Sequence, residues 1–244
     1  MNGSAVVHAP YESWRRHFLA NREIACKLEW DRSESLSGAE RLVVGRSIQQ
    51  FQLGEFARGR GFLRRAARHR ELGAEPEFVK SLELFIQEEQ RHSLLLREFL
   101  EHERIPLLGG DAVDDVFRRL RKLAGLEVCV MVLVTAEVLA IPFYSALREA
   151  TNSRVLKAIC ARILRDEAAH LKYQALTLGL IRKKLSHPER VLRSFAHSAL
   201  FHGTALVLWL QHRRVFHAAR RDFHGFWRQA RACFRWLEVQ TSRS

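Results

Sequence analysis

The sequence predicts an all-α protein, and three observations support this fold class. Only five prolines and thirteen glycines are spread over 244 residues, which leaves long uninterrupted segments. Alternating Val/Ile/Thr runs bounded by turns, which are typical of strands, are absent. Two Glu-x-x-His pairs fall inside apolar stripes of helical period. The expected architecture is an antiparallel four-helix bundle made of two hairpins, with extra C-terminal helices.

The first hairpin begins at a capping signal. Ser37 and Glu40 have the Ser-x-x-Glu spacing of a capping box, which predicts one long helix over residues 37–72. Gly73 is a natural stop for that helix. A second helix is expected over residues 76–104, because the proline at its start suits a first helical turn.

The second hairpin is expected to follow a short helix over residues 112–122. Its first long helix should cover residues 123–150 and should kink at Pro142, which lies inside it. Ser153 belongs to the turn and is suited to cap the next helix. That fourth helix should end near Ser186.

The chain divides into three parts on this basis. Residues 1–36 form an N-terminal extension, residues 37–185 form the four-helix bundle, and residues 186–244 form a basic C-terminal extension packed on the bundle. The C-terminal part should contain two helices, roughly over residues 189–219 and 222–238.

The positive charge is concentrated at the C-terminal end. The net charge is +13, and residues 178–244 hold 13 of the 40 Lys and Arg but only 3 of the 27 Asp and Glu. A basic surface suits an anionic partner, either nucleic acid or a membrane surface. The simpler interpretation is a solvated basic face. A second copy of the chain, forming a homodimer, is a further candidate partner.

The apolar and aromatic residues of this extension leave three interpretations open. Residues 195–210 are mostly apolar but short for a membrane span, so a helix packed on the bundle is the first. Arginines follow directly, so a helix lying on a membrane surface is the second. The third is a nucleic-acid surface on which bases stack, using four aromatic residues beside arginines: Trp209, Phe223, Trp227 and Trp236.

The cysteines and the N-terminus favour a cytoplasmic protein. The four cysteines are scattered without a C-x-x-C motif, which argues against an iron knuckle, a zinc ribbon or a disulfide framework. Residues 1–11 lack the cationic start and apolar stretch of a secretory signal. Peripheral association with a membrane is compatible with the same features.

The two Glu-x-x-His pairs are Glu89 with His92 and Glu167 with His170. Residues three apart on a helix lie on the same face, so each carboxylate and imidazole can bind one metal ion. A charged Glu in an apolar stripe costs several kcal/mol if left unpaired, and a metal ion is a strong partner.

Each of the other two helices should add one carboxylate. Glu55 is the acidic residue in the interior of the first helix. On the third, Glu137 is as far before the turn as Glu167 is after it, whereas Glu127 lies roughly 15 Å further away and Glu149 lies at the turn. The predicted metal ligands are therefore Glu55, Glu89, His92, Glu137, Glu167 and His170.

Several nearby residues are assigned by their position on the helices. Glu88, Glu98 and Asp166 fall off the apolar stripes or at their edges, so we expect them to face solvent. Tyr144 lies two turns after Glu137 on the same face, as a candidate hydrogen-bond donor or redox residue, or as a packing residue. Three arginines could be charges near the site or solvent-facing residues: Arg58, Arg91 and Arg165.

The pattern resembles the ferritin-like superfamily of dinuclear carboxylate proteins, over about residues 37–185. The stretch from Ile163 to His170, with the Ala136-Glu137 pair, is similar to the second half of such bundles. The resemblance implies two iron ions, with manganese as an alternative. It also implies that Glu89 and Glu167 bridge the metals, that Glu55 and Glu137 are terminal ligands, and that each histidine binds one metal.

The expected activity is that of a dinuclear metal oxidoreductase. Mixed carboxylate and imidazole ligands suit Fe or Mn, and we expect an O2-dependent oxidase or oxygenase that acts on a small organic substrate. The absence of an iron–sulfur knuckle requires an external electron donor. The alternatives are an iron-handling ferroxidase, a peroxide-reducing rubrerythrin-like protein, and a tRNA-modifying hydroxylase that uses the basic C-terminal surface.

Overall fold

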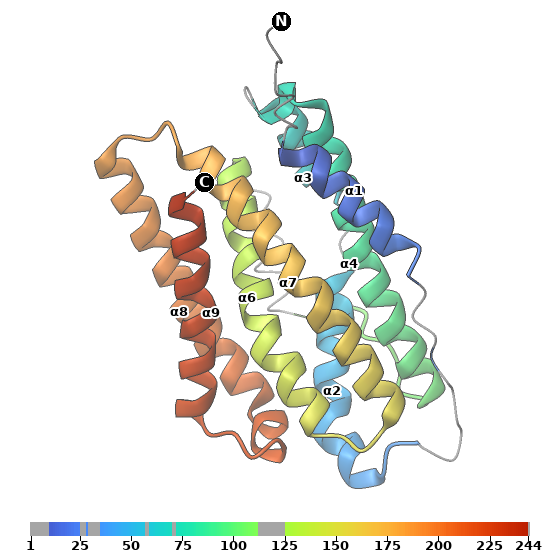
Figure 1. Cartoon of the computed structure of the whole chain (residues 1–244). Helices are drawn as coiled ribbons and strands as arrows, with labels where there is room; N and C mark the ends of the chain where they lie inside the picture. The colour runs from blue at the N-terminus through green and yellow to red at the C-terminus, as the bar shows by residue number, and fades with distance from the viewer. Residues whose placement is uncertain are drawn as a thin grey trace, which may run out of the picture.

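The computed structural model describes residues 10–24, 28, 35–56, 59–69, 72–111 and 125–243. The described residues form helices and no strands, as the sequence predicts. Figure 1 shows four central helices, flanked on one side by a C-terminal pair and on the other by a short N-terminal helix. The short helix expected over residues 112–122 lies outside the described residues.

The first hairpin consists of α2 (Gly38–Glu55), α3 (Arg60–Arg68) and α4 (Pro76–His102). The predicted capping box is present: the Ser37 hydroxyl accepts a hydrogen bond from the Glu40 amide, and the Glu40 carboxylate accepts one from the Ser37 amide. A 3-10 turn over Leu72–Ala74 precedes α4, which begins with its proline in the first turn.

The single long helix predicted over residues 37–72 is wrong, because the chain breaks between α2 and α3. Gly59 has a φ of 63° and caps α3, a conformation that only glycine adopts readily. A Cβ atom at Gly59 would lie 2.7 Å from the side chain of Ile86 on α4. The break therefore brings the backbone close to α4, directly after the Glu55 carboxylate.

The second hairpin consists of α6 (Leu126–Glu149) and α7 (Arg154–Arg182). α6 continues through Pro142, and the kink expected there stays a prediction. The Ser153 hydroxyl accepts a hydrogen bond from the Leu156 amide at 3.3 Å and caps α7, as expected. α6 is long and apolar enough to cross a membrane, but 78% of that apolar window is buried inside the fold, as in a core helix.

The C-terminal pair is α8 (His187–Ala218) and α9 (Phe223–Arg243). α8 contacts α2 and α6, and α9 contacts α6 and α7, so the pair extends the bundle (Figure 1). The fourth helix ends at Arg182, near the predicted end, and Ser186 caps α8 through a second capping box with Glu189. The N-terminal extension contains a helix that the sequence did not reveal, α1 (Pro10–Arg22), which lies against α4.

Two apolar clusters lie on either side of a polar layer. One contains Phe78, Phe85 and Tyr173 with residues of α1, and the other contains Phe99 and Ile163 with residues of α8 and α9. Along α4 and α7, the Glu-x-x-His pairs fall between these clusters. The two Glu-x-x-His pairs therefore lie near the middle of these helices.

Candidate metal centre

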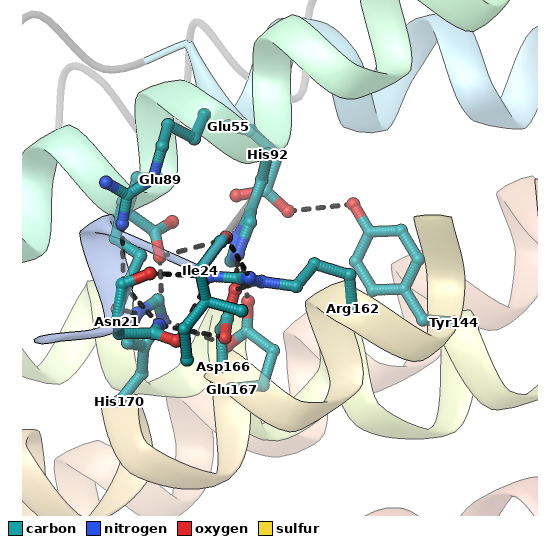
Figure 2. A network of polar contacts seen from close by, with 12 residues as sticks. Asn21, Ile24, Glu55, Glu89, His92, Tyr144, Arg162, Asp166, Glu167 and His170 are labelled. Atoms are coloured by element: carbon teal, nitrogen blue, oxygen red, sulfur yellow. Dashed lines mark hydrogen bonds and ion pairs between the residues drawn. The ribbon is translucent and has the colours of Figure 1, made fainter. Parts of the chain in front are cut away.

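The structure brings all six predicted ligands together. Two groups of side chains have carboxylate oxygens or imidazole nitrogens within 4.8 Å of one another. The first contains Glu55, Glu89, His92 and Glu167, and the second contains Glu89, Glu137 and His170. Glu89 belongs to both groups, and Figure 2 shows its carboxylate among the neighbouring ligands.

The two imidazoles present the same nitrogen to the cluster. His92 Nδ1 lies 3.7 Å from Glu167 Oε1, and His170 Nδ1 lies 3.7 Å from Glu167 Oε2 and 2.8 Å from Glu89 Oε1. The two oxygens of Glu167 thus face different histidines, which is the arrangement a bridging carboxylate requires. Five buried polar atoms of the cluster have no hydrogen bond of regular geometry, although Glu89 Oε1 and His170 Nδ1 form an ion pair at 2.8 Å: Glu89 Oε1, His92 Nδ1, Glu137 Oε2, Glu167 Oε2 and His170 Nδ1.

The other nitrogen of each imidazole is held by a carboxylate from the opposite helix. His92 Nε2 on α4 lies 3.1 Å from Asp166 Oδ2 on α7, and His170 Nε2 on α7 lies 3.0 Å from Glu88 Oε2 on α4. Carboxylates that accept this hydrogen bond fix the orientation of a metal-binding imidazole and raise its basicity. α4 and α7 therefore contribute in the same way, each with one imidazole and with the carboxylate that holds the imidazole of the other helix.

The expectation that Glu88 and Asp166 face solvent is wrong. Glu88 is 0% exposed and Asp166 is 2% exposed. The periodicity of α4 and α7 places both residues at the edge of the apolar stripe, but α1 covers that edge. One signal in the sequence could have identified them: in both Glu-x-x-His motifs an acidic residue directly precedes the Glu. Glu98, by contrast, is exposed as predicted.

Three further side chains complete a buried network around these two carboxylates (Figure 2). Asn21 on α1 donates its amide N–H groups to Glu88 and to Asp166. Arg162 donates to Asp166 at 2.7 Å, and Arg91 donates to Glu88 at 2.7 Å. Asn21 and Arg162 were not found from the sequence, whereas Arg91 is one of the arginines considered there.

The remaining two carboxylates have one neutral donor each. The Tyr144 hydroxyl donates a 2.8 Å hydrogen bond to Glu55 Oε1, and Figure 2 shows the phenol directed at that carboxylate. Gln174 donates to Glu137 Oε1 at 3.3 Å. Tyr144 therefore occupies the hydrogen-bonding position that the sequence offered as one option.

The acids that the sequence set aside have other partners. Glu127 forms ion pairs with Arg182 and Arg193, at 2.8 and 2.7 Å. Glu149 pairs with Arg221 at 2.6 Å near the turn between α6 and α7. Both carboxylates serve the packing of the C-terminal half.

The electrostatics of the cluster show an excess of buried negative charge. Burial, and then the charges of nearby glutamates, raise the pKa of Glu55 and Glu137 well above the ordinary range. Burial and the Glu89 charge also raise the pKa of Glu167. Burial likewise opposes ionisation of Glu89, but the charge of His170 outweighs it and lowers the pKa of Glu89 to about 2. Without a metal, these glutamates therefore tend to keep their protons, which reduces the negative charge of the cluster. Divalent cations would neutralise the same charge.

A cavity of about 180 Å³ opens beside the carboxylates. Its wall includes all four glutamates of the cluster but neither His92 nor His170. The cavity therefore meets the site on its carboxylate side, away from the two imidazoles. The rest of the wall is mostly apolar, with residues of α2, α6 and α8 that include Phe51, Val132, Leu139, Ala140, Val207 and Leu208, and with Gln50, Thr204, Gln211 and His212 as polar groups.

Solved structures of other proteins share the fold of this chain. No family model matches the chain, and no curated protein sequence matches it. Two solved structures resemble it over 96% of its length and 93% of theirs, with TM-scores of 0.66 and 0.67 and identities of 14% and 15%. Both are single-substitution variants of an R2-like ligand-binding oxidase, one with an anaerobically and one with an aerobically reconstituted Mn/Fe cofactor. This likeness confirms the predicted ferritin-like helical fold.

Proposed function

We propose that this protein is a dinuclear metal oxidase or oxygenase that uses two iron ions, or manganese with iron. The observation that supports this most is the convergence of four carboxylates and two imidazoles, in which His92 Nδ1, Glu137 Oε2 and Glu167 Oε2 have no hydrogen-bond partner. Four carboxylates balance the charge of two divalent cations. The ligand types suit Fe and Mn rather than metals that prefer thiolates, and the structural neighbours carry an Mn/Fe cofactor.

Each side chain would have its own role in holding such a metal pair. Glu89 and Glu167 would bridge, because one belongs to both ligand groups and the other faces both histidines. Glu55 and His92 would complete one metal position, and Glu137 and His170 the other. Redox-active ions bound in pairs supply the electrons for O2 chemistry.

The protein's own groups prepare the site for this chemistry. Glu88 and Asp166 hold the Nε2 protons of the imidazoles, so both Nδ1 atoms remain available to bind. Tyr144 donates to Oε1 of Glu55 and thereby orients that carboxylate. The largely apolar wall of the cavity lowers the polarity beside the carboxylates.

The cavity is the proposed place for a small organic substrate. It reaches the four carboxylates directly, and the other polar groups of its wall are uncharged apart from Asp111. A largely apolar molecule with one or two hydrogen-bonding groups fits this lining. An external reductant would supply further electrons, since the described residues contain no second redox centre of cysteine ligands.

The test is anaerobic loading with ferrous iron followed by exposure to air. We expect about two irons per chain by elemental analysis and rapid oxygen consumption, and the loss of both in the double variant Glu89→Ala, Glu167→Ala. Protein that binds two irons and consumes neither oxygen nor peroxide would contradict the proposal. Consumption of peroxide alone would favour a rubrerythrin-like reductase, and oxidation of many irons per chain a ferroxidase.

A further inference from the structure

Asn21 connects the two halves of the candidate metal centre. Its amide nitrogen donates to Glu88 Oε1 and, at 3.0 Å, to Asp166 Oδ1, and its amide oxygen accepts from Arg162 Nη2 at 3.1 Å. The side chain is almost fully buried, at 8% exposed. The hydrogen-bonding capacity of this one amide is used by three charged groups from two helices.

The position of Asn21 matters because of what Glu88 and Asp166 contact. Glu88 holds the imidazole of His170, and Asp166 holds the imidazole of His92. Two carboxylates that approach from different helices repel each other and need a shared donor. An asparagine supplies two N–H groups from a single point without adding charge.

We propose that Asn21 is a positioning residue for both histidines at once, so that docking of α1 sets the geometry of the whole site. This inference rests on the proposed metal-binding function. α1 does not depend on Asn21 for its docking, because Tyr11 and Phe18 are buried in the apolar cluster against Phe78 and Phe85. A change at Asn21 therefore perturbs the site without removing the helix.

Arg91 and Arg162 each contact one of the two carboxylates, so changes at these arginines can be compared with changes at Asn21. Arg91 contacts only the Glu88 side and is partly exposed, with 31% of its side chain accessible. Arg162 contacts Asp166 and Asn21 and also donates to the backbone oxygens of Asn21 and Ile24. Arg91→Gln should affect one half of the site, whereas a change at Asn21 should affect both.

The experiment titrates metal-free protein with Co²⁺, whose visible spectrum reports the geometry of each ion. The variants are Asn21→Asp, which keeps the shape but replaces the donor by an acceptor, Asn21→Ala and Arg91→Gln. We expect Asn21→Asp to lower the affinity for both ions about 10-fold or more, with altered spectra, at unchanged helix content. Arg91→Gln should change the binding of one ion only.

The Co²⁺ titration distinguishes a positioning role of Asn21 from a packing role. If Asn21→Asp binds two Co²⁺ with the affinity and spectrum of the unaltered protein, Asn21 acts by packing and the inference is wrong. If Asn21→Asp does not fold, Asn21→Ala decides in the same way. If the unaltered protein itself fails to bind two ions, the proposed function fails instead.

A second inference comes from the exposed side of α8. We define the α8 stripe as the solvent-facing residues that recur with helical period along this helix: Leu192, Phe195, Ala196, Ala199, Leu206 and Leu210. Phe195 is 72% exposed, Leu192 is 66% and Leu210 is 57%. The opposite side of α8 is also apolar, with Phe201, Ala205 and Phe216 fully buried. A helix that is apolar on both sides requires a second apolar environment.

Cations are concentrated at the C-terminal end of the stripe. Arg213 and Arg214 are exposed there without a carboxylate partner among the described residues, whereas the exposed Glu189 stands beside Arg190 at its start. A second copy packed in parallel would bring Arg213 and Arg214 against the same arginines. An anionic lipid surface matches both the apolar residues and the flanking cations.

We infer that the α8 stripe is the surface through which the protein docks on an anionic membrane. The adjoining side of α8 supplies Thr204, Val207 and Gln211 to the cavity wall. The docked orientation would place the cavity beside the lipid, the phase in which apolar molecules concentrate. This inference depends on the exposed residues of α8 and not on the metal site.

Sedimentation with lipid vesicles tests this surface. We expect binding to vesicles that contain an anionic phosphatidylglycerol fraction and much weaker binding to phosphatidylcholine alone, with loss of binding in Phe195→Glu, Leu210→Glu. The control is Leu42→Glu, which changes a residue that is 77% exposed on α2. No vesicle binding, a dimer that the double variant dissociates, or salt-sensitive tRNA binding in place of lipid binding would each overturn the inference.

Discussion

The carboxylate of Glu88 lies 3.0 Å from Nε2 of His170, on the opposite hairpin, and not beside the histidine of its own motif. Asp166 and His92 repeat this relationship in the other direction. Each hairpin therefore orients the metal-facing atom of the other, and the site forms only when the two hairpins assemble.

Replacement of Glu88 by Gln tests this crossed arrangement. A neutral amide holds the imidazole N–H less strongly, so we expect metal affinity to fall roughly 10- to 100-fold. Competition with a chelator measures the effect. Glu98→Gln, an exposed change on the same helix, should leave the affinity unaltered, and equal affinities for both variants would argue against a role for Glu88.

Glu137→Gln should change stability in opposite directions with and without metal. Burial raises the pKa of Glu137, so above the ordinary pKa of a glutamate the unfolded chain ionises while the folded protein resists, which lowers the free energy of unfolding. The amide removes that cost, and we expect the metal-free variant to gain about 1 to 3 kcal/mol. The metal-loaded variant should be less stable, because it lacks a ligand. Thermal unfolding with chelator and with Fe²⁺ measures both, and a shift of the same sign in the two conditions would contradict the ligand role.

Tyr144→Phe should keep both metals but weaken the fold. The hydroxyl donates to Glu55 from a fully buried position, so its loss should cost about 1 kcal/mol. Burial, and then the charge of Glu55, raise the pKa of Tyr144 well above its usual value, so it should remain a neutral phenol up to alkaline pH. Metal analysis and urea unfolding check the two expectations, and loss of one metal would mean that Tyr144 is itself a ligand.

Two buried histidines that are not candidate metal ligands should make the protein sensitive to acid. Burial, and then the charge of Arg182, lower the pKa of His197 to about 3, while burial lowers the pKa of His212 to about 4. Their unfolded pKa is near 6.5, so the unfolded chain takes up protons first as the pH falls. The free energy of unfolding should therefore decrease below pH 6.5, with a slope approaching about 1.4 kcal/mol per pH unit for each histidine.

Matched variants isolate this effect. His212 Nδ1 lies 2.8 Å from the Ser47 hydroxyl, and His197 Nε2 lies 3.1 Å from Thr135, whose own proton goes to the Met131 oxygen. His212→Asn and His197→Gln keep a polar atom near these partners but do not titrate. Urea unfolding at pH 7 and pH 5 should show a smaller pH dependence in both variants, and an unchanged slope would assign the acid sensitivity to other groups.

Much of the fold could be predicted from local patterns in the sequence. The capping box at Ser37, the proline at the start of α4 and the cap at Ser153 are short-range signals, because they depend on residues within one helical turn. The apolar stripes with their Glu-x-x-His pairs identified which carboxylates and imidazoles share a helix face. Equal distances from the turn pointed to Glu137, which the structure places beside Glu167 and His170.

The sequence by itself determined the long helices of the second hairpin, several helix caps and the helix faces that carry the six candidate side chains, because each follows from spacing along one helix. Only the tertiary structure decided how α1 covers Glu88 and Asp166, how Asn21 joins them, and where Gly59 breaks the first helix against Ile86. Helical periodicity shows which direction a residue faces but not which distant segment lies there. Contacts between segments as far apart as Asn21 and Asp166 depend on the assembly of the whole bundle.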